Sequence, residues 1–129
     1  MNVKQTKRYT LGEEIFSSVS HGVGAALAIA GSAVVIVKSA FSGSAYAVVG
    51  ASVYSATLII LYIMSTLYHS FTNPTAKYVF RIFDHCTIFL LIAGTYTPLT
   101  LVTLRGAAGW VVFGVIWGAA VLGIVLNAV

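Results

Sequence analysis

The sequence predicts an all-α protein, a polytopic membrane helix bundle with four transmembrane helices. Three observations support this fold class. Of the 129 residues, 59% are hydrophobic and 8% are charged, and the mean hydropathy is +0.96. Four stretches reach the roughly 20 apolar residues that cross a bilayer. The charged side chains fall between these stretches or at their ends, which excludes an ordinary soluble domain.

The expected spans cover residues 17–37, 46–68, 82–104 and 108–129. We divide the chain into a basic tail with the start of the first helix, residues 1–16, and a transmembrane helical domain, residues 17–129. The connections between spans are short, so consecutive helices should be antiparallel neighbours.

Turn residues separate the spans. Asn73-Pro74 ends the second span, because proline lacks an amide hydrogen and disfavours helical geometry in the residue before it. Pro98 lies inside the third span and predicts a kink. Small residues predict close helix contacts at Gly24, Ala28 and Ser32 in the first span and at Gly114 and Gly118 in the fourth.

The basic residues indicate topology. A formal charge of +4 and a pI near 9.4 would suggest a nucleic-acid partner for a soluble chain. Here we expect no nucleic acid, because Lys and Arg lie between apolar spans. Lys38 and Arg105 fall on one side of the membrane, and five basic residues fall on the other: Lys4, Lys7, Arg8, Lys77 and Arg81. We expect the side with five to be cytoplasmic and to hold the N-terminus, because an excess of basic residues marks the cytoplasmic face.

Ionisable residues gather between Ser65 and His85, a stretch with two of the three histidines and the only aspartate. Such groups are costly at the edge of apolar segments and indicate a functional site. Ser65 and His69 share one face of the second helix. Asp84 and His85 are adjacent, about 100° apart around the axis, so both cannot point at one centre. We expect Asp84 to face inward.

Two interpretations of His69 and Asp84 stay open from spacing alone. A neutral imidazole is a common zinc ligand, and a carboxylate can bind the metal or orient its water. Catalytic zinc needs three protein ligands, and this pair supplies at most two. The alternative is an interhelical hydrogen bond that satisfies both groups. His85 and Cys86 are weaker candidates, because a lone cysteine is usually a small buried hydrophobe.

A second polar face is expected on the first helix. Glu14, Ser18 and His21 follow at i, i+4 and i+7 and so share a face near the cytoplasmic end. Glu14 is either part of the site or a carboxylate that complements the helix dipole. Glu13 is expected to be solvated.

Five motifs along the chain resemble the bacterial hemolysin III family, which is related to the progestin and adipoQ receptors, including the adiponectin receptors. They occur in the family's order: Tyr9-Thr10-Leu11-Gly12-Glu13-Glu14, Ser20-His21-Gly22-Val23-Gly24, Ser65-Thr66-Leu67-Tyr68-His69, Phe83-Asp84-His85 and Ala93-Gly94-Thr95-Tyr96-Thr97-Pro98.

The resemblance implies a seven-helix fold in a bacterial inner (plasma) membrane, with zinc near the cytoplasmic helix ends. His69 resembles the second-helix zinc ligand, Ser65 its serine partner, and Asp84 the carboxylate that orients water at the metal. Glu14 and His21 match the first-helix motif. The family pattern places the remaining ligands in a last helix, and the sequence stops at Val129 before such a motif. We therefore expect a fragment or truncated member with an incomplete zinc ligand set.

Three functions compete. The first is a zinc-dependent membrane hydrolase of a lipid amide or ester, similar to the alkaline ceramidases. The second is a pore or cytolysin, as the family name implies, and the third is a non-catalytic sensor of membrane lipid state. Membrane lipid is the expected partner, and a second copy of the chain is a further candidate.

Overall fold

The computed structural model describes residues 9–129, and all of its regular structure is helical. Helix α1 spans Leu11–Phe41, α2 Ala45–Ser70, α3 Pro74–Pro98 and α4 Gly106–Ala128, and α3 continues directly into a π-helix, η1, at Leu99–Leu104. Four helical segments are long and apolar enough to cross a membrane. These observations confirm the all-α membrane fold class for the part of the chain that the structure describes. Lys4, Lys7 and Arg8 of the predicted topology signal lie outside it.

Helix α1 begins earlier than the expected span because Thr10 forms a capping box with Glu13. The Thr10 hydroxyl accepts from the Glu13 amide at 3.3 Å, and the Glu13 carboxylate accepts from the Thr10 amide at 2.7 Å. Each of these side chains accepts a hydrogen bond from a backbone N–H that has no partner within the helix. Glu14 therefore lies in the first helical turn rather than in a tail.

Helix α3 also begins earlier, at Pro74. The Asn73 side chain accepts from the amides of Thr75 at 3.0 Å and Ala76 at 3.1 Å. Proline is well suited to the first helical position, because an amide hydrogen at that position would have no partner within the helix. The polar stretch after Asn73 is thus the first turn of α3, and it carries Lys77 on a rigid helix.

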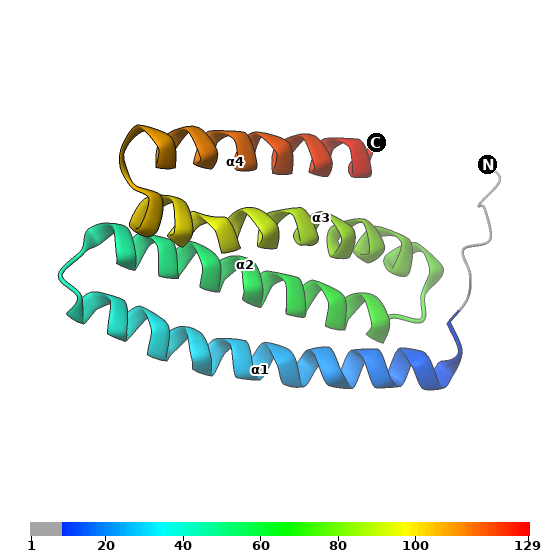
Figure 1. Cartoon of the computed structure of the whole chain (residues 1–129). Coiled ribbons are helices and arrows are strands. Elements are labelled where there is room, and N and C mark those ends of the chain that lie inside the picture. Colours follow the sequence, from blue (N-terminus) through cyan, green and yellow to red (C-terminus); the bar gives the residue numbers. More distant parts are fainter. Residues whose placement is uncertain (1–8) are drawn as a thin grey trace.

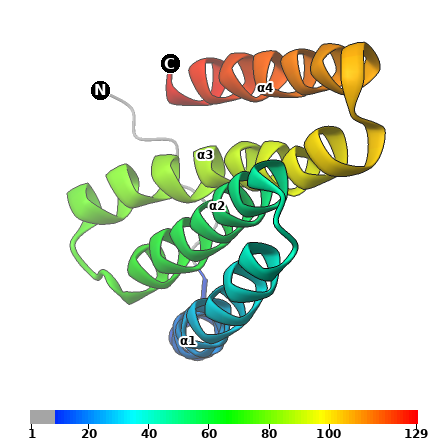
Figure 2. The same cartoon turned by 90° about the vertical axis from the view of Figure 1, so that its left-hand side faces the viewer.

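The helices are stacked in chain order. Helix α1 packs against α2, α2 against α3, and α4 against α3 and η1. Figures 1 and 2 show the successive helices running in alternating directions, with α1 and α4 on opposite sides of the molecule. The start of α1, the end of α2 and the start of α3 therefore meet at one end.

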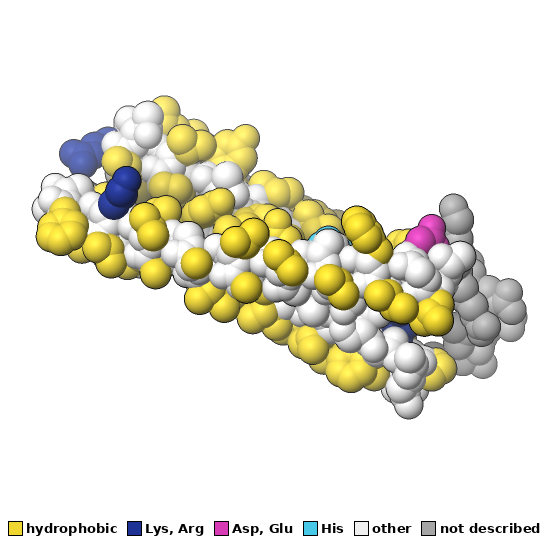
Figure 3. Space-filling model, turned by 90° about the horizontal axis from the view of Figure 1, so that it is seen from below, with side chains coloured by type: hydrophobic (Ala, Val, Ile, Leu, Met, Phe, Trp, Pro, Cys, Tyr) yellow, Lys and Arg dark blue, Asp and Glu magenta, His cyan; other side chains and the backbone are white. Residues whose placement is uncertain are grey.

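The contact surfaces between helices are made of small and hydroxyl-bearing side chains. Many large apolar side chains instead point outward, as the yellow surface in Figure 3 shows. Lipid tails are as apolar as these side chains, so close packing of small residues favours association in a membrane. The buried residues include Ala28, Ser32, Ala51, Ser55, Thr57, Ser65, Thr87, Ala93, Thr97, Thr100 and Ala120.

The predicted small-residue face of α1 is confirmed. A Cβ atom on Gly24 would lie 2.6 Å from Tyr62 of α2, and Ala28 and Ser32 are buried. The predicted face of α4 is wrong, since a Cβ on Gly114 or Gly118 would meet nothing within 4 Å among the described residues. Other positions carry the contact, and a Cβ on Gly123 would lie 2.6 Å from Phe89 of α3.

At Pro98, where the sequence predicts a kink, the helix changes from α- to π-helical hydrogen bonding. Proline leaves the carbonyl four residues earlier without its usual donor. The hydroxyls of Thr97 and Thr100 bond back to the carbonyls of Ala93 at 2.7 Å and Thr97 at 3.0 Å. A Cβ on Gly50 would lie 2.9 Å from the Pro98 Cα. The α2–α3 contact therefore requires glycine at the site of the interruption.

Replacing Gly94 by Ala should separate α2 from α3, because the new methyl group would collide with the Thr57 side chain. We expect the free energy of unfolding in detergent to fall by about 1–3 kcal/mol. The matched control is Gly118→Ala on α4, which should change it by less than about 0.5 kcal/mol. Equal effects of the two substitutions would contradict this packing.

Candidate functional site

Polar side chains from three helices meet where α1 begins, α2 ends and α3 begins. We call this group the end cluster. It takes three residues from one face of α1, three from the last two turns of α2 and one from the first turn of α3: Glu14, Ser18, His21, Ser65, His69, Ser70 and Lys77.

Glu14 is the central residue of the end cluster. One carboxylate oxygen lies 2.7 Å from His69 Nδ1, and the other lies 2.6 Å from Lys77 Nζ. The side chains of Glu14 and His69 are only 15% and 10% exposed. A single carboxylate therefore joins α1 to α2 and to α3, although α1 packs only against α2 among the described helices.

The hydrogen bond that His69 donates to Glu14 selects the tautomer that the ring has when it is neutral. An ionised carboxylate only accepts, so Nδ1 carries a proton, and in the neutral form of the ring the lone pair lies on Nε2. Aromatic rings surround the imidazole, with Tyr68 at 4.6 Å, Tyr9 at 5.6 Å and His21 at 6.0 Å between ring centroids. This packing restricts the orientation of the ring.

The polar faces predicted on α1 and α2 meet each other. His21 Nδ1 lies 2.6 Å from the Ser65 hydroxyl, and the Ser18 hydroxyl lies 2.6 Å from that of Ser70. Ser65 is 3% exposed, so its hydroxyl is enclosed by protein. The helical spacing predicted that these residues share a face on each helix, and the structure adds that the two faces contact each other.

Asp84 does not join His69. Its side chain is half-buried on α3, and within residues 9–129 no hydrogen bond or ion pair links the two groups. The interhelical hydrogen bond considered between His69 and Asp84 is therefore wrong, and His69 bonds Glu14 of α1 instead. Helix α1 brings a carboxylate directly to the ring, whereas Asp84 lies well inside α3.

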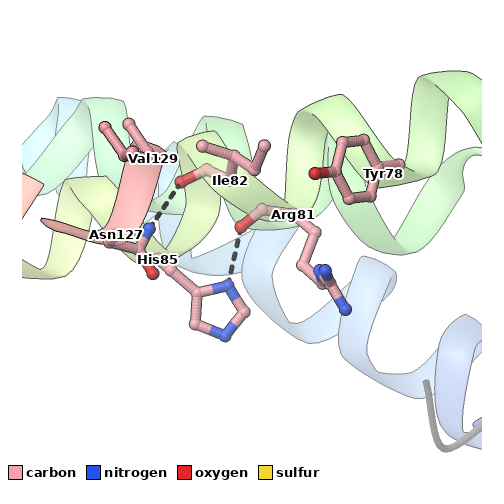
Figure 4. A pocket seen from close by; sticks show the side chains of 7 residues that line it. Tyr78, Arg81, Ile82, His85, Asn127 and Val129 are labelled. Carbon is pink, nitrogen blue, oxygen red and sulfur yellow. Dashed lines mark hydrogen bonds between the residues drawn. The ribbon is translucent and has the colours of Figure 1, made fainter. Parts of the chain in front are cut away.

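The side chains of His85 and Cys86 lie away from the end cluster. His85 is exposed, and its Nδ1 lies 2.7 Å from the Arg81 carbonyl oxygen (Figure 4). It lines a cavity of about 310 Å³ beside the end of α4, together with Tyr78 and Asn127 (Figure 4). Cys86 is buried against α4, with its sulfur 3.3 Å from Asn127 Nδ2.

Among the described residues, His69 is arranged as a zinc ligand would be. A metal-binding histidine commonly donates its other ring N–H to a carboxylate, which fixes its tautomer and orientation. His69 and Glu14 have this arrangement. Across residues 9–129, however, no three His, Cys, Asp or Glu side chains are grouped closely enough to hold a metal ion. The described residues alone therefore do not form a three-ligand site.

Sequence reasoning did not identify Lys77 and Ser70 as members of the end cluster. Lys77 was treated as a topology signal, yet its ammonium group bonds Glu14 and lies 5.0 Å from the Tyr68 ring centroid. Its position three residues after the proline that begins α3 is a sequence feature that indicates a place at this end of the bundle. No sequence feature indicates Ser70, because its partner Ser18 is 52 residues away.

Comparison with known proteins identifies the family. A profile described as Haemolysin-III related matches residues 9–129, which is nearly the whole chain and includes every residue of the end cluster. The chain belongs to the haemolysin-III-related family. This confirms the resemblance drawn from the five motifs.

Two haemolysin-III relatives illustrate the match. Hemolysin-3 of Bacillus cereus is 45% identical over 115 residues, which cover 89% of this chain and 52% of the relative. A Hemolysin-3 homolog of Bacillus subtilis (strain 168) is 38% identical over 119 residues, covering 92% and 56%. The chain thus spans about half the length of these relatives. No solved structure matches it.

Replacing Glu14 by Gln should loosen this haemolysin-III bundle at one end, because Lys77 loses its counter-charge in a partly buried position. We expect the free energy of unfolding to fall by about 1–3 kcal/mol. Amide hydrogen exchange should accelerate most in the first turn of α3. Both can be measured in detergent micelles.

Glu13→Gln is the matched control, because glutamine retains the capping box. It should change the free energy of unfolding by less than about 0.5 kcal/mol. If Glu13→Gln destabilises the protein as much as Glu14→Gln does, the central role of Glu14 is wrong.

Proposed function

We propose that this chain supplies part of a zinc site in a haemolysin-III-type membrane protein, and that the complete site hydrolyses an amide or ester bond of a membrane lipid. The observation that carries the proposal is the Glu14–His69 hydrogen bond of 2.7 Å, which leaves Nε2 of the imidazole available as a ligand. The remaining ligands would come from another part of a longer protein or from another chain.

Zinc, when bound, would polarise a carbonyl and lower the pKa of coordinated water to about 7. The residues of this chain would prepare that chemistry. Glu14 would hold the imidazole of His69, and Lys77 would keep the Glu14 carboxylate in place. Asp84 is proposed to orient water, since it is half-buried and its carboxylate has no hydrogen-bond partner within the described residues. Ser65 would position His21 in the polar face.

The membrane setting favours a lipid substrate. The end cluster lies at the ends of apolar helices, close to the depth where amide and ester linkages of lipids meet water. We further propose a bacterial inner-membrane location with the end cluster on the cytoplasmic side. Lys77 and Arg81 lie at that end, and Lys4, Lys7 and Arg8 precede α1 in the sequence, which gives five basic residues against two, Lys38 and Arg105. An excess of basic residues marks the cytoplasmic face.

Cytolysis is the second candidate, because both relatives carry the name Hemolysin-3. A pore requires a continuous polar path. Along the described helices, Thr57 and Thr97 are buried and bond to carbonyl oxygens of their own helices. Ser55 is the exception, as its buried hydroxyl has no partner among the described residues. This arrangement favours a site at one membrane face over a pore through one copy of the chain.

Replacing the residue equivalent to His69 by Ala in a full-length relative should remove zinc while the protein still inserts into membranes. Elemental analysis after extensive washing should show about one zinc per chain in the parent and about a tenth or less in the variant. The control is the equivalent of His85→Ala, which should retain the metal because His85 faces away from the end cluster. Stoichiometric zinc in the His69 variant would overturn the ligand assignment.

Replacing the residue equivalent to Asp84 by Asn should separate zinc binding from turnover. We expect unchanged zinc content and a fall of about 100-fold or more in the hydrolysis of N-acyl and ester lipids. Unchanged turnover would exclude Asp84 as a water-orienting residue. A parent protein that holds zinc but hydrolyses none of these lipids would instead favour the sensor of lipid state.

A further inference from the structure

The charged side chains are divided unequally between the two ends of the helices. The chain has three acidic residues, Glu13, Glu14 and Asp84, and all lie toward the end cluster. Lys38, in the last turn of α1, and Arg105, between η1 and α4, lie at the opposite end. Figure 3 shows acidic side chains at one end of the molecule and basic side chains at the other. Asp84 and Arg105 are separated by about 30 Å of helix. No carboxylate side chain within residues 1–129 can therefore neutralise Arg105.

Arg105 lines a cavity of about 170 Å³ at this opposite end. The cavity lies between the first turns of α2, the π-helix η1 and the first turns of α4, and its other polar side chains are Tyr46, Thr100 and Trp110. A liquid water occupies about 30 Å³, so the cavity is large enough for a polyatomic anion. The residues that line it include an arginine, a tryptophan and a tyrosine, whose side chains can all donate hydrogen bonds, and no acidic residue.

The polar groups of the cavity are unequally engaged. The Arg105 amide donates to the Thr100 carbonyl at 3.2 Å, and the Arg105 carbonyl accepts from the Gly109 amide at 3.2 Å. The Thr100 hydroxyl donates to the Thr97 carbonyl at 3.0 Å. The Arg105 guanidinium, the Tyr46 hydroxyl and the Trp110 indole N–H make no hydrogen bond within residues 9–129, and of these three groups the guanidinium alone is charged.

We place the cavity at the depth of lipid headgroups from its position in the chain. Arg105 is the single residue between the membrane-spanning segments Pro74–Leu104 and Gly106–Ala128. Trp110 and Tyr46 beside it are about half exposed, at 54% and 50%. Tryptophan and tyrosine are enriched at the membrane–water interface, where their rings meet the headgroups.

We propose that this cavity binds the phosphodiester group of a membrane glycerophospholipid. The planar guanidinium of Arg105 binds two phosphate oxygens, a geometry that suits arginine. Tyr46 and Trp110 lie beside the glycerol and headgroup and donate to the remaining oxygens. A phosphodiester is the anion present in excess at this depth, which favours a lipid over free phosphate in the surrounding solution.

Native mass spectrometry of the purified chain, released from detergent after titration with phosphatidylglycerol, tests the proposal. The wild type should retain one phospholipid. Arg105→Gln should weaken its retention by about tenfold or more, because a charge-assisted bidentate contact is lost. Lys38→Gln is the matched control, since it removes one cation from the same end outside the cavity, and it should bind as the wild type does. Equal loss in both variants, or none in Arg105→Gln, would overturn the proposal.

Two further measurements are needed. The first distinguishes a lipid phosphate from a soluble one, and the second tests the site without relying on the folding of Arg105→Gln. Glycerol phosphate added at the same concentration should not displace the lipid; displacement would assign the cavity to a soluble phosphate and overturn the lipid. In wild-type protein, short-chain phosphatidylglycerol should change the fluorescence of Trp110, and Trp110→Phe should abolish that change. A change that persists in Trp110→Phe would place the lipid elsewhere, and this readout does not depend on Arg105→Gln folding.

Discussion

The carboxylate of Glu14 holds one end of the molecule together. It bonds His69 of α2 and Lys77 of α3 at 2.7 and 2.6 Å, and the short connection between α2 and α3 brings these two partners to the same end of the molecule. The pairing of a carboxylate with an ammonium and an imidazole lets three ionisable groups lie at the edge of an apolar bundle. The orientation of His69 and any metal chemistry at its free nitrogen depend on that carboxylate.

Different forces hold the rest of the bundle. Away from the end cluster, α2 and α3 approach closely through Gly50 and Gly94, and the buried side chains are small or hydroxyl-bearing. Helix α4 adds few polar contacts, such as the Trp117 indole N–H that donates to the Thr97 hydroxyl at 3.1 Å. The molecule therefore has one electrostatically linked end and a body held by close packing, which is suited to an apolar solvent.

The two ends suit different chemistry. At one end, carboxylates and imidazoles are paired and shielded, an arrangement suited to a metal ligand and to proton-accepting groups. At the other end, Arg105 and Lys38 have no acidic side chain within reach, so that end is suited to anions from the membrane surface. The two proposals made above, a metal ligand at one end and a headgroup site at the other, follow this division of charge.

Sequence alone determined the fold class, the helix order and the polar faces of α1 and α2, because hydropathy and the 3.6-residue period are local properties. It identified Glu14 and His21 on one polar face and Ser65 and His69 on another as candidate site residues. Only the tertiary structure decided which groups pair. Glu14 rather than Asp84 bonds His69, and Lys77 completes the bridge, because pairing depends on how antiparallel helices are offset and rotated. Contacts over 50 residues of separation leave no local pattern, and a face such as that of Gly114 and Gly118 can point away from every described neighbour.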